Sequence, residues 1–132
     1  MHIIGIIGPY FSGGNRRLID HNIANARYIM ILIANHFAEN RLVGAFAPHS
    51  HTAQFERLAQ APETYYHAFD DAIYDRACEA FIMLPEWDKS SGATRDCKRA
   101  MEQKKKLFFL ASYEIEDTDK LLNSLEQWAR QS

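Results

Sequence analysis

Residues 3–9 read Ile-Ile-Gly-Ile-Ile-Gly-Pro, and this stretch decides the fold class. A short run rich in isoleucine is typical of a strand that is buried on both faces of a parallel sheet. The Gly-Pro pair that follows is a turn signal and ends the strand in a loop. We therefore expect a buried parallel strand here, and the remaining sequence must supply helices that cover both of its faces.

Strand-like and helix-like segments alternate along the rest of the chain. Apolar runs at residues 43–47, 80–84 and 107–111 predict three more strands. Between them, apolar residues recur at three- and four-residue steps, which predicts helices over 19–40, 65–77, 92–105 and 117–130. The positions expected to face the core in the first two helices are Ile19, Ile23, Ala26, Met30, Ile33, Phe37, Tyr65, Phe69, Ile73 and Ala77.

This alternation predicts one α/β domain over residues 1–132, a Rossmann-like, flavodoxin-like sandwich with a parallel sheet and helices on both faces. The segment 49–62 is polar, has no clear period and is long for a connection, so we expect a loop with the character of a lid. No internal repeat or second domain is indicated.

Composition and charge exclude several classes of protein. With 47% hydrophobic and 24% charged residues the chain is an ordinary globular protein, and a net charge of −2 gives no reason to bind a nucleic acid polymer or an anionic membrane. The apolar N-terminal run is too short to span a membrane and lacks the features of a signal peptide. Cys78 and Cys97 form no metal-ligand pattern, so we expect free thiols and a cytoplasmic location.

In such sheets ligands bind beyond the carboxyl ends of the strands, which directs attention to the segment 84–96. Its Ser-Ser-Gly turn at residues 90–92 opens a helix, and free backbone N–H groups there can face an anion or a hydroxyl. Asp96 follows one turn later, and Asp71 can reach the same pocket from the preceding helix. Two carboxylates near a sugar can act as nucleophile and as acid/base or hydroxyl anchor. The same Ser-Ser-Gly is also an ordinary helix cap, so spacing alone leaves both interpretations open.

A larger set of residues resembles the nucleoside 2-deoxyribosyltransferase superfamily over roughly residues 2–111. The resemblance rests on the order and spacing of Gly8-Pro9-Tyr10, Asn22, Ala26, Pro48-His49, Asp71 and Trp87-x-x-Ser90-x-Gly92-Ala93-x-x-Asp96. It is closest to the nucleotide N-glycosidase members and to an uncharacterised, often phage-associated branch.

The resemblance implies a role for each matching residue. Asp96 stands where the family has a glutamate that attacks the anomeric carbon, and Asp71 stands where an aspartate contacts ribose hydroxyls. Ser90, beside Gly92, and the backbone of the first loop, from Gly8 and Pro9 onward, would hold a 5′-phosphate. Trp87 or Tyr10 would stack on the base.

The resemblance also implies a nucleoside or nucleotide ligand, no cofactor and a homo-oligomer, because family members build their sites across subunit contacts. Aspartate at 96 departs from the family, since it is one methylene, about 1.5 Å, shorter than glutamate, and misplacement of about 1 Å can cost a hundredfold in rate. Three hypotheses therefore stay open: an N-glycosidic enzyme, a non-catalytic nucleotide-binding module, and a structural or protein-interaction domain. His49 and His51 have no third ligand at a recognisable distance, so we expect His49 to form hydrogen bonds in the pocket rather than a metal site.

Overall fold

The computed structural model describes residues 1–53, 55 and 58–132, and its sheet has four parallel strands. They are β1 (His2–Ile7), β2 (Val43–Phe46), β3 (Ala80–Met83) and β4 (Lys106–Phe109), in the order β2-β1-β3-β4. Each neighbouring pair is in parallel register, with Ile4 opposite Ala45 on one side and Ala80 on the other. The predicted α/β fold is confirmed.

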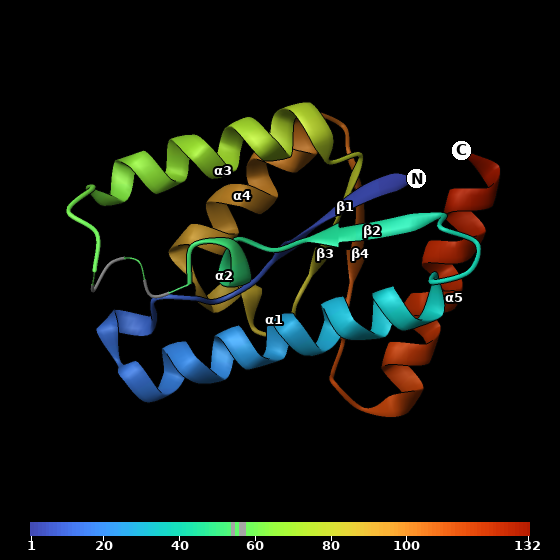
Figure 1. The fold of residues 1–132 in the computed structure, drawn as a ribbon, viewed down its shortest axis with the longest axis horizontal. Helices are drawn as coiled ribbons and strands as arrows, with labels where there is room; N and C mark the ends of the chain where they lie inside the picture. Colours follow the sequence, from blue (N-terminus) through green and yellow to red (C-terminus); the bar gives the residue numbers. More distant parts are fainter. Residues whose placement is uncertain (54, 56–57) are drawn as a thin grey trace.

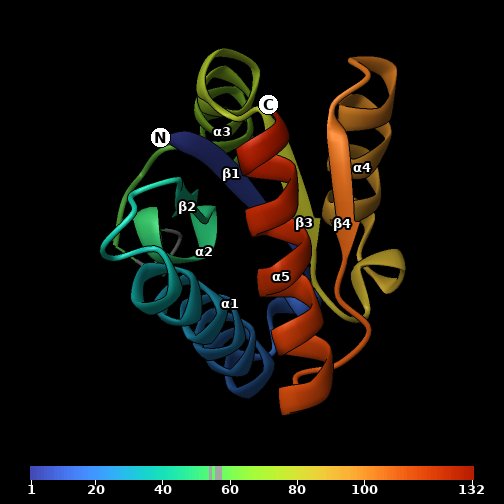
Figure 2. The same cartoon turned by 90° about the vertical axis from the view of Figure 1, so that its right-hand side faces the viewer.

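Four long helices cover the sheet in two layers. One face is covered by α1 (Arg16–His36) and α5 (Ile115–Gln131), and the other by α3 (Glu63–Ala77) and α4 (Ser91–Glu102) (Figures 1 and 2). Short helical turns lie between them: η1 (Ser12–Gly14), α2 (Pro48–His51) and η3 (Trp87–Lys89). Because β1 leads into α1 on one face while β3 leads into α4 on the other, the chain diverges between these neighbouring strands, which is where parallel sheets of this kind form ligand sites.

Each face of the sheet packs its own apolar core. Under α1 and α5, isoleucines of β1 and β3 contact a row of α1 side chains, and Ile19, Ala26, Ile29, Ile33 and Phe37 are all buried. Asn15 caps α1 by accepting a hydrogen bond from the Leu18 backbone N–H at 3.2 Å. Under α3 and α4 a second cluster contains Ile7, Tyr74, Phe81, Met83 and Cys97. Both cysteines are free and buried.

The predicted buried face of the helix before β3 is wrong. Tyr65 and Phe69 are 54% and 38% exposed, and Ala77 is also exposed, whereas Tyr74 is only 5% exposed and its neighbours Tyr66 and Asp70 face inward. Two helical registers, one residue apart, fit the aromatic spacing of this segment. In the structure the inward-facing stripe has the carboxyl group of Asp70 in its middle. A search for apolar residues at helical spacing therefore selects the neighbouring stripe, which contains Tyr65 and Phe69.

Several predicted boundaries also differ from the structure. The first long helix spans Arg16–His36 rather than 19–40, and the chain turns after it at Arg41, whose φ is 55°. Within the segment expected to be an irregular loop, Pro48–His51 form the short helix α2, because proline at its first position is pre-organised for a helix. The lid prediction for 49–62 falls partly on residues 54, 56 and 57, which lie outside the described residues.

Among the helices of the described residues, none is both long enough and apolar enough to cross a membrane.

Candidate functional site

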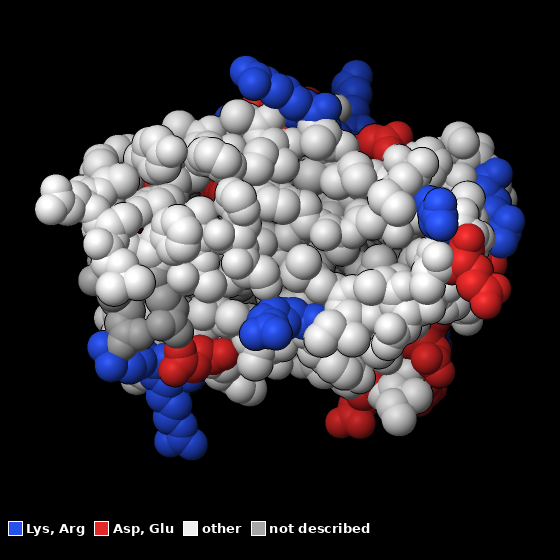
Figure 3. Space-filling view, in the orientation of Figure 1, with Lys and Arg blue, Asp and Glu red and all other residues white. Residues whose placement is uncertain are grey.

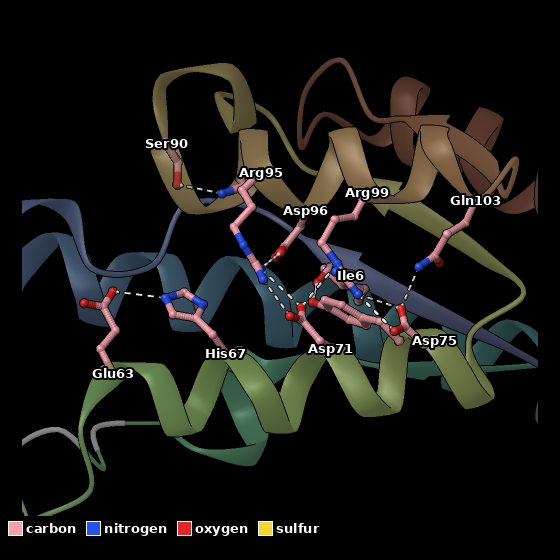
Figure 4. Close-up of polar contacts among 12 residues, drawn as sticks. Ile6, Glu63, His67, Asp71, Asp75, Ser90, Arg95, Asp96, Arg99 and Gln103 are labelled. Atoms are coloured by element: carbon pink, nitrogen blue, oxygen red, sulfur yellow. Dashed lines mark hydrogen bonds and ion pairs between the residues drawn. The ribbon is translucent and has the colours of Figure 1, made fainter.

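The carboxylates of α3 and α4 meet in a charged cluster between the two helices (Figure 4). Arg95 reaches from α4 to Asp71 on α3, donating from Nη2 at 2.6 Å and from Nη1 at 3.2 Å, and its Nη1 also donates to Asp96 at 3.0 Å. One turn further along, Arg99 donates to Asp75 at 2.9 Å and lies 3.5 Å from Asp71. The structure thus brings together the two carboxylates that the sequence proposed, Asp71 and Asp96, through a shared guanidinium.

Asp70 and Asp96 both have pKa values raised to about 6. For Asp96 the cause is burial, with Arg95 opposing it; for Asp70 the cause is also burial, and the charge of Asp96 raises its pKa further. One carboxylate oxygen of Asp70, Oδ1, is buried and has no hydrogen-bond partner among the described residues. Paired carboxyls with raised pKa values are typical of sites that transfer protons near neutral pH.

Tyr74 connects this carboxyl cluster to the end of β1. Its hydroxyl is fully enclosed and donates a hydrogen bond to the Ile6 carbonyl at 3.2 Å. Burial, and then the charges of Asp96 and Asp70, raise the pKa of Tyr74 well above its ordinary value. Its phenol is therefore neutral at physiological pH and anchors the middle of α3 to the sheet.

Ser90 and Gly92 lie at the beginning of α4. The Ser90 hydroxyl accepts a hydrogen bond from the Ala93 backbone N–H at 3.2 Å, so it is the N-cap of α4. As a hydroxyl it can still donate to a ligand. Apart from the backbone of α4 and the two residues next to Gly92, no atom of the described residues lies within 4 Å of where a side chain on Gly92 would begin, so the space beside the first turn of α4 is open.

We expect Ser90→Ala to lower the free energy of unfolding by about 1 kcal/mol, because α4 loses its cap. Chemical denaturation checks this, with Ser124→Ala, an exposed serine within α5, expected to change stability by less than about 0.5 kcal/mol. Equal effects of the two substitutions would contradict the capping role.

The first loop and α2 hold the remaining predicted residues. His49 is 4% exposed and its Nε2 donates to the Pro9 carbonyl at 2.8 Å, while its ring contacts that of Tyr10 edge-on at 5.7 Å. Burial lowers the pKa of His49, so the ring is neutral and Nδ1 is an acceptor that is buried without a partner among the described residues. Gly8 is required by packing: a Cβ there would lie 2.8 Å from the Leu84 side chain.

Trp87 is not brought to the carboxyl cluster. Its ring contacts Phe109 of β4, with ring centroids 5.9 Å apart. It also lines an apolar groove with Thr94, Cys97 and Met101, on the side of α4 that faces away from α3. Of the two aromatic side chains expected to stack on a base, Tyr10 lies at the carboxyl end of β1 beside His49, whereas Trp87 packs beside the edge strand.

Sequence reasoning missed three members of the cluster: Asp70, Arg95 and Arg99. A signal for the arginines was present, because Arg95 and Arg99 are one turn apart on α4, as Asp71 and Asp75 are on α3, and two such rows can pair. Asp70 gave no such signal. No group of three or more His, Cys, Asp or Glu side chains within the described ranges is arranged to hold a metal ion.

Comparison with known proteins adds no relative: no family model, no curated protein and no solved structure matches the chain.

Proposed function

We propose that the chain cleaves or transfers at the N-glycosidic bond of a nucleoside or nucleoside 5′-monophosphate, with Asp96 as nucleophile. The observation that carries this proposal is the pair Asp70 and Asp96, two carboxyls with pKa values of about 6 on neighbouring helices. Glycosidic cleavage needs an ionised carboxylate and a protonated one at the same time, and a pair that titrates together near pH 6 provides both.

In the proposed reaction the Asp96 carboxylate forms a bond to the anomeric carbon as the bond to the base nitrogen breaks. The base leaves with the electron pair of that bond and takes a proton from Asp70. Water then attacks the anomeric carbon, Asp70 takes its proton, and Asp96 is released as a carboxylate. In transfer, a second base replaces the water. No metal or cofactor is needed, because the carboxylate supplies the nucleophile.

The proposed ligand contacts follow from the positions of the other residues. Arg95 fixes Asp71 with two hydrogen bonds, which would orient it toward sugar hydroxyls. The open first turn of α4, with Ser90 and Gly92, would receive a 5′-phosphate. The resemblance to the nucleoside 2-deoxyribosyltransferase superfamily supports these assignments, and a cytoplasmic location remains part of the proposal.

The test is incubation of the protein with a panel of nucleosides and 5′-monophosphates, with and without an acceptor base, followed by chromatography of free and exchanged base. We expect base release by the wild type and none by Asp96→Ala. Asp75→Asn is the matched control, because Asp75 lies one turn away, is 43% exposed and pairs with Arg99, so base release should stay within about twofold. Equal release by wild type and Asp96→Ala would contradict the proposal.

A non-catalytic nucleotide-binding module is the second candidate. Aspartate in place of the family's glutamate favours it, as does the hydrogen bond from Arg95 that already engages Asp96 at 3.0 Å. A module of this kind would bind a nucleotide in the same place without turnover. Binding that survives Asp96→Asn, measured by calorimetry with the same panel and with no base released, would support this candidate over the enzyme.

We also propose that the chain assembles as a homo-oligomer through the face around β2. Within the described part of the chain this edge strand pairs only with β1, and the face that contains it has a largely uncharged centre with charged side chains toward its rim (Figure 3). Tyr65 and Phe69 expose 54% and 38% of their surface, and their rings lie 6.3 Å apart. Phe69 contacts the ring of His51, which in turn contacts Phe46 of β2. Exposed apolar side chains gathered on one face are a mark of an interface.

Phe69→Lys is therefore expected to shift the mass in light scattering from a multiple of the 15.2 kDa chain to the single chain. Its ring stacks on that of His51 at 5.1 Å and lies outside both buried clusters, so the folded chain should survive the substitution. Ile31→Lys, at a 53% exposed position on α1, is the control that should leave the mass unchanged. A monomeric wild type would contradict the proposal.

A further inference from the structure

A cavity lies on the opposite face of the sheet from the carboxyl cluster, at the carboxyl ends of β1, β3 and β4. It measures about 400 Å³, within the usual range for small-molecule sites. The beginnings of α1 and α5 lie at the same end of the molecule (Figure 2). Its lining combines Pro9 of the first loop, His21, Asn22 and Asn25 of α1, Glu86 after β3, and Ser112 and Tyr113 after β4.

The polar groups of this cavity are largely positioned before any ligand enters. Asn22 donates from Nδ2 to the Tyr10 carbonyl at 3.0 Å and to the Ser12 hydroxyl at 2.9 Å, which leaves its carbonyl oxygen as an acceptor. The Ser112 hydroxyl donates a hydrogen bond to Oδ2 of Asp117 at 2.6 Å, which fixes its position. Burial raises the pKa of Tyr113 to about 12, with the charge of Glu86 adding to it, so its hydroxyl is protonated and can donate.

Glu86 occupies a strained backbone position at the mouth of the cavity. Its φ of 67° and ψ of 14° lie in the left-handed region, which a residue other than glycine rarely adopts. Strain of this kind often occurs at ligand sites. The side chain pairs with Lys89 at 3.3 Å, so the carboxylate is already balanced and can accept hydrogen bonds without requiring a cation.

The lining defines the chemistry of the ligand. His21 is the one basic-type side chain among the lining residues and no lysine or arginine joins it, so the lining offers a phosphate or carboxylate no bidentate contact. A carboxamide offers one donor and one acceptor side by side, and this pair matches a ring nitrogen next to an exocyclic amino group. Glu86 can accept from the same amino group, and Pro9, Pro85 and the ring of Tyr113 offer apolar surface.

We propose that this cavity binds a small, uncharged, amino-substituted heterocycle, with Asn25 and Glu86 reading its amino edge. Asn25 carries the bidentate contact, because Asn22 already uses its amide N–H groups within the protein. The site is separate from the carboxyl cluster and does not depend on the proposed reaction.

Calorimetric titration with adenine and cytosine, each paired with its oxo counterpart hypoxanthine or uracil, tests the site. We expect at least one amino heterocycle to bind about tenfold more tightly than its oxo counterpart. Asn25→Leu and, separately, Glu86→Gln should each weaken that binding about tenfold, whereas Asp96→Asn should leave it unchanged. The second variant keeps the test decisive where the first fails to fold.

Two results would overturn the inference. One is the absence of binding by both adenine and cytosine. The other is binding that Asp96→Asn removes and Asn25→Leu preserves, which would place the heterocycle in the carboxyl cluster. Because Asp96→Ala decides base release and Asn25→Leu decides this site, failure of one proposal is distinguishable from failure of the other.

Discussion

Asp70→Asn is expected to lower the rate of base release by about a hundredfold to ten-thousandfold, the usual contribution of a general acid or base. The leaving base needs a proton, and Asp70, with its pKa raised to about 6 by burial and by the charge of Asp96, is the group that can hold one. In the wild type the rate should fall on the alkaline side of about pH 6 as Asp70 ionises. The variant should lack that alkaline limb, which a pH profile of kcat/KM shows directly.

The same substitution is expected to stabilise the protein at pH 7. The folded protein holds a proton on Asp70 up to about pH 6, whereas the ordinary pKa is 3.8, so the free energy of unfolding falls as pH rises through this window. Replacing the carboxylate with a neutral amide removes this penalty. After allowance for solvent screening, the gain should be about 1 kcal/mol at pH 7 and vanish below about pH 4.

Asp71→Asn is the matched control for stability and should have the opposite sign. Asp71 accepts two hydrogen bonds from Arg95, so neutralising it removes a favourable ion pair worth about 1 kcal/mol. Denaturant titration of both variants at pH 7 measures the difference. If both variants lost stability equally, Asp70 would be an ordinary hydrogen-bonded carboxylate rather than a buried one whose ionised form lowers the free energy of unfolding.

Arg95→Met is expected to destabilise the protein by about 1–2 kcal/mol at pH 7, because Asp71 and Asp96 then share a site without their guanidinium. Both carboxylates are mostly enclosed, with 17% and 21% of the side chain exposed. Loss of Arg95, which opposes the effect of burial, should raise the pKa of Asp96 further. The folded variant therefore binds protons more readily than the unfolded chain, and its deficit should shrink as pH falls toward 5.

Arg130→Met is the control for this substitution. Arg130 pairs with Glu126 at 3.3 Å on the exposed side of α5, and its loss should cost less than about 0.5 kcal/mol at any pH. Thermal unfolding at pH 5 and pH 7 separates the two cases. A deficit for Arg95→Met that is independent of pH would mean that its aliphatic stem, rather than its charge, stabilises α3 against α4.

The strands and their layering could be predicted from the sequence because each strand is a short apolar run with its own turn signal, whereas the order β2-β1-β3-β4 comes from the structure. Residues 3–7 and 80–84 have no solvent-exposed face, so they need no alternating polar residues. Each therefore reads as a continuous apolar run, which indicates a buried strand unambiguously. The first helix was equally clear, since Ile19, Ala26 and Ile33 lie on one stripe and all are buried. Its limits were less clear, because Arg16 and Arg17 begin the helix before the apolar stripe starts, and buried Phe37 continues the stripe one residue past the end of the helix at His36.

The helix before β3 shows why part of the site could not be predicted. Its buried stripe contains Tyr66, Asp70 and Tyr74, and a carboxyl group in that stripe conceals the register from any count of apolar residues. Ion pairs between side chains of different helices are also hard to predict from the sequence, because the contact of Arg95 with Asp71 depends on how α3 and α4 pack. Trp87 belongs to the same sequence motif as Ser90 and Asp96, yet its side chain lines the apolar groove and contacts Phe109 of β4.

The most direct test of the central claim is mass spectrometry of the protein quenched during turnover with the nucleotide that releases base. We expect one added sugar, or sugar phosphate, on the peptide that contains Asp96, and no such adduct in Asp96→Asn. Base release by Asp96→Asn at the wild-type rate, with no adduct on either protein, would contradict a carboxylate nucleophile at this position.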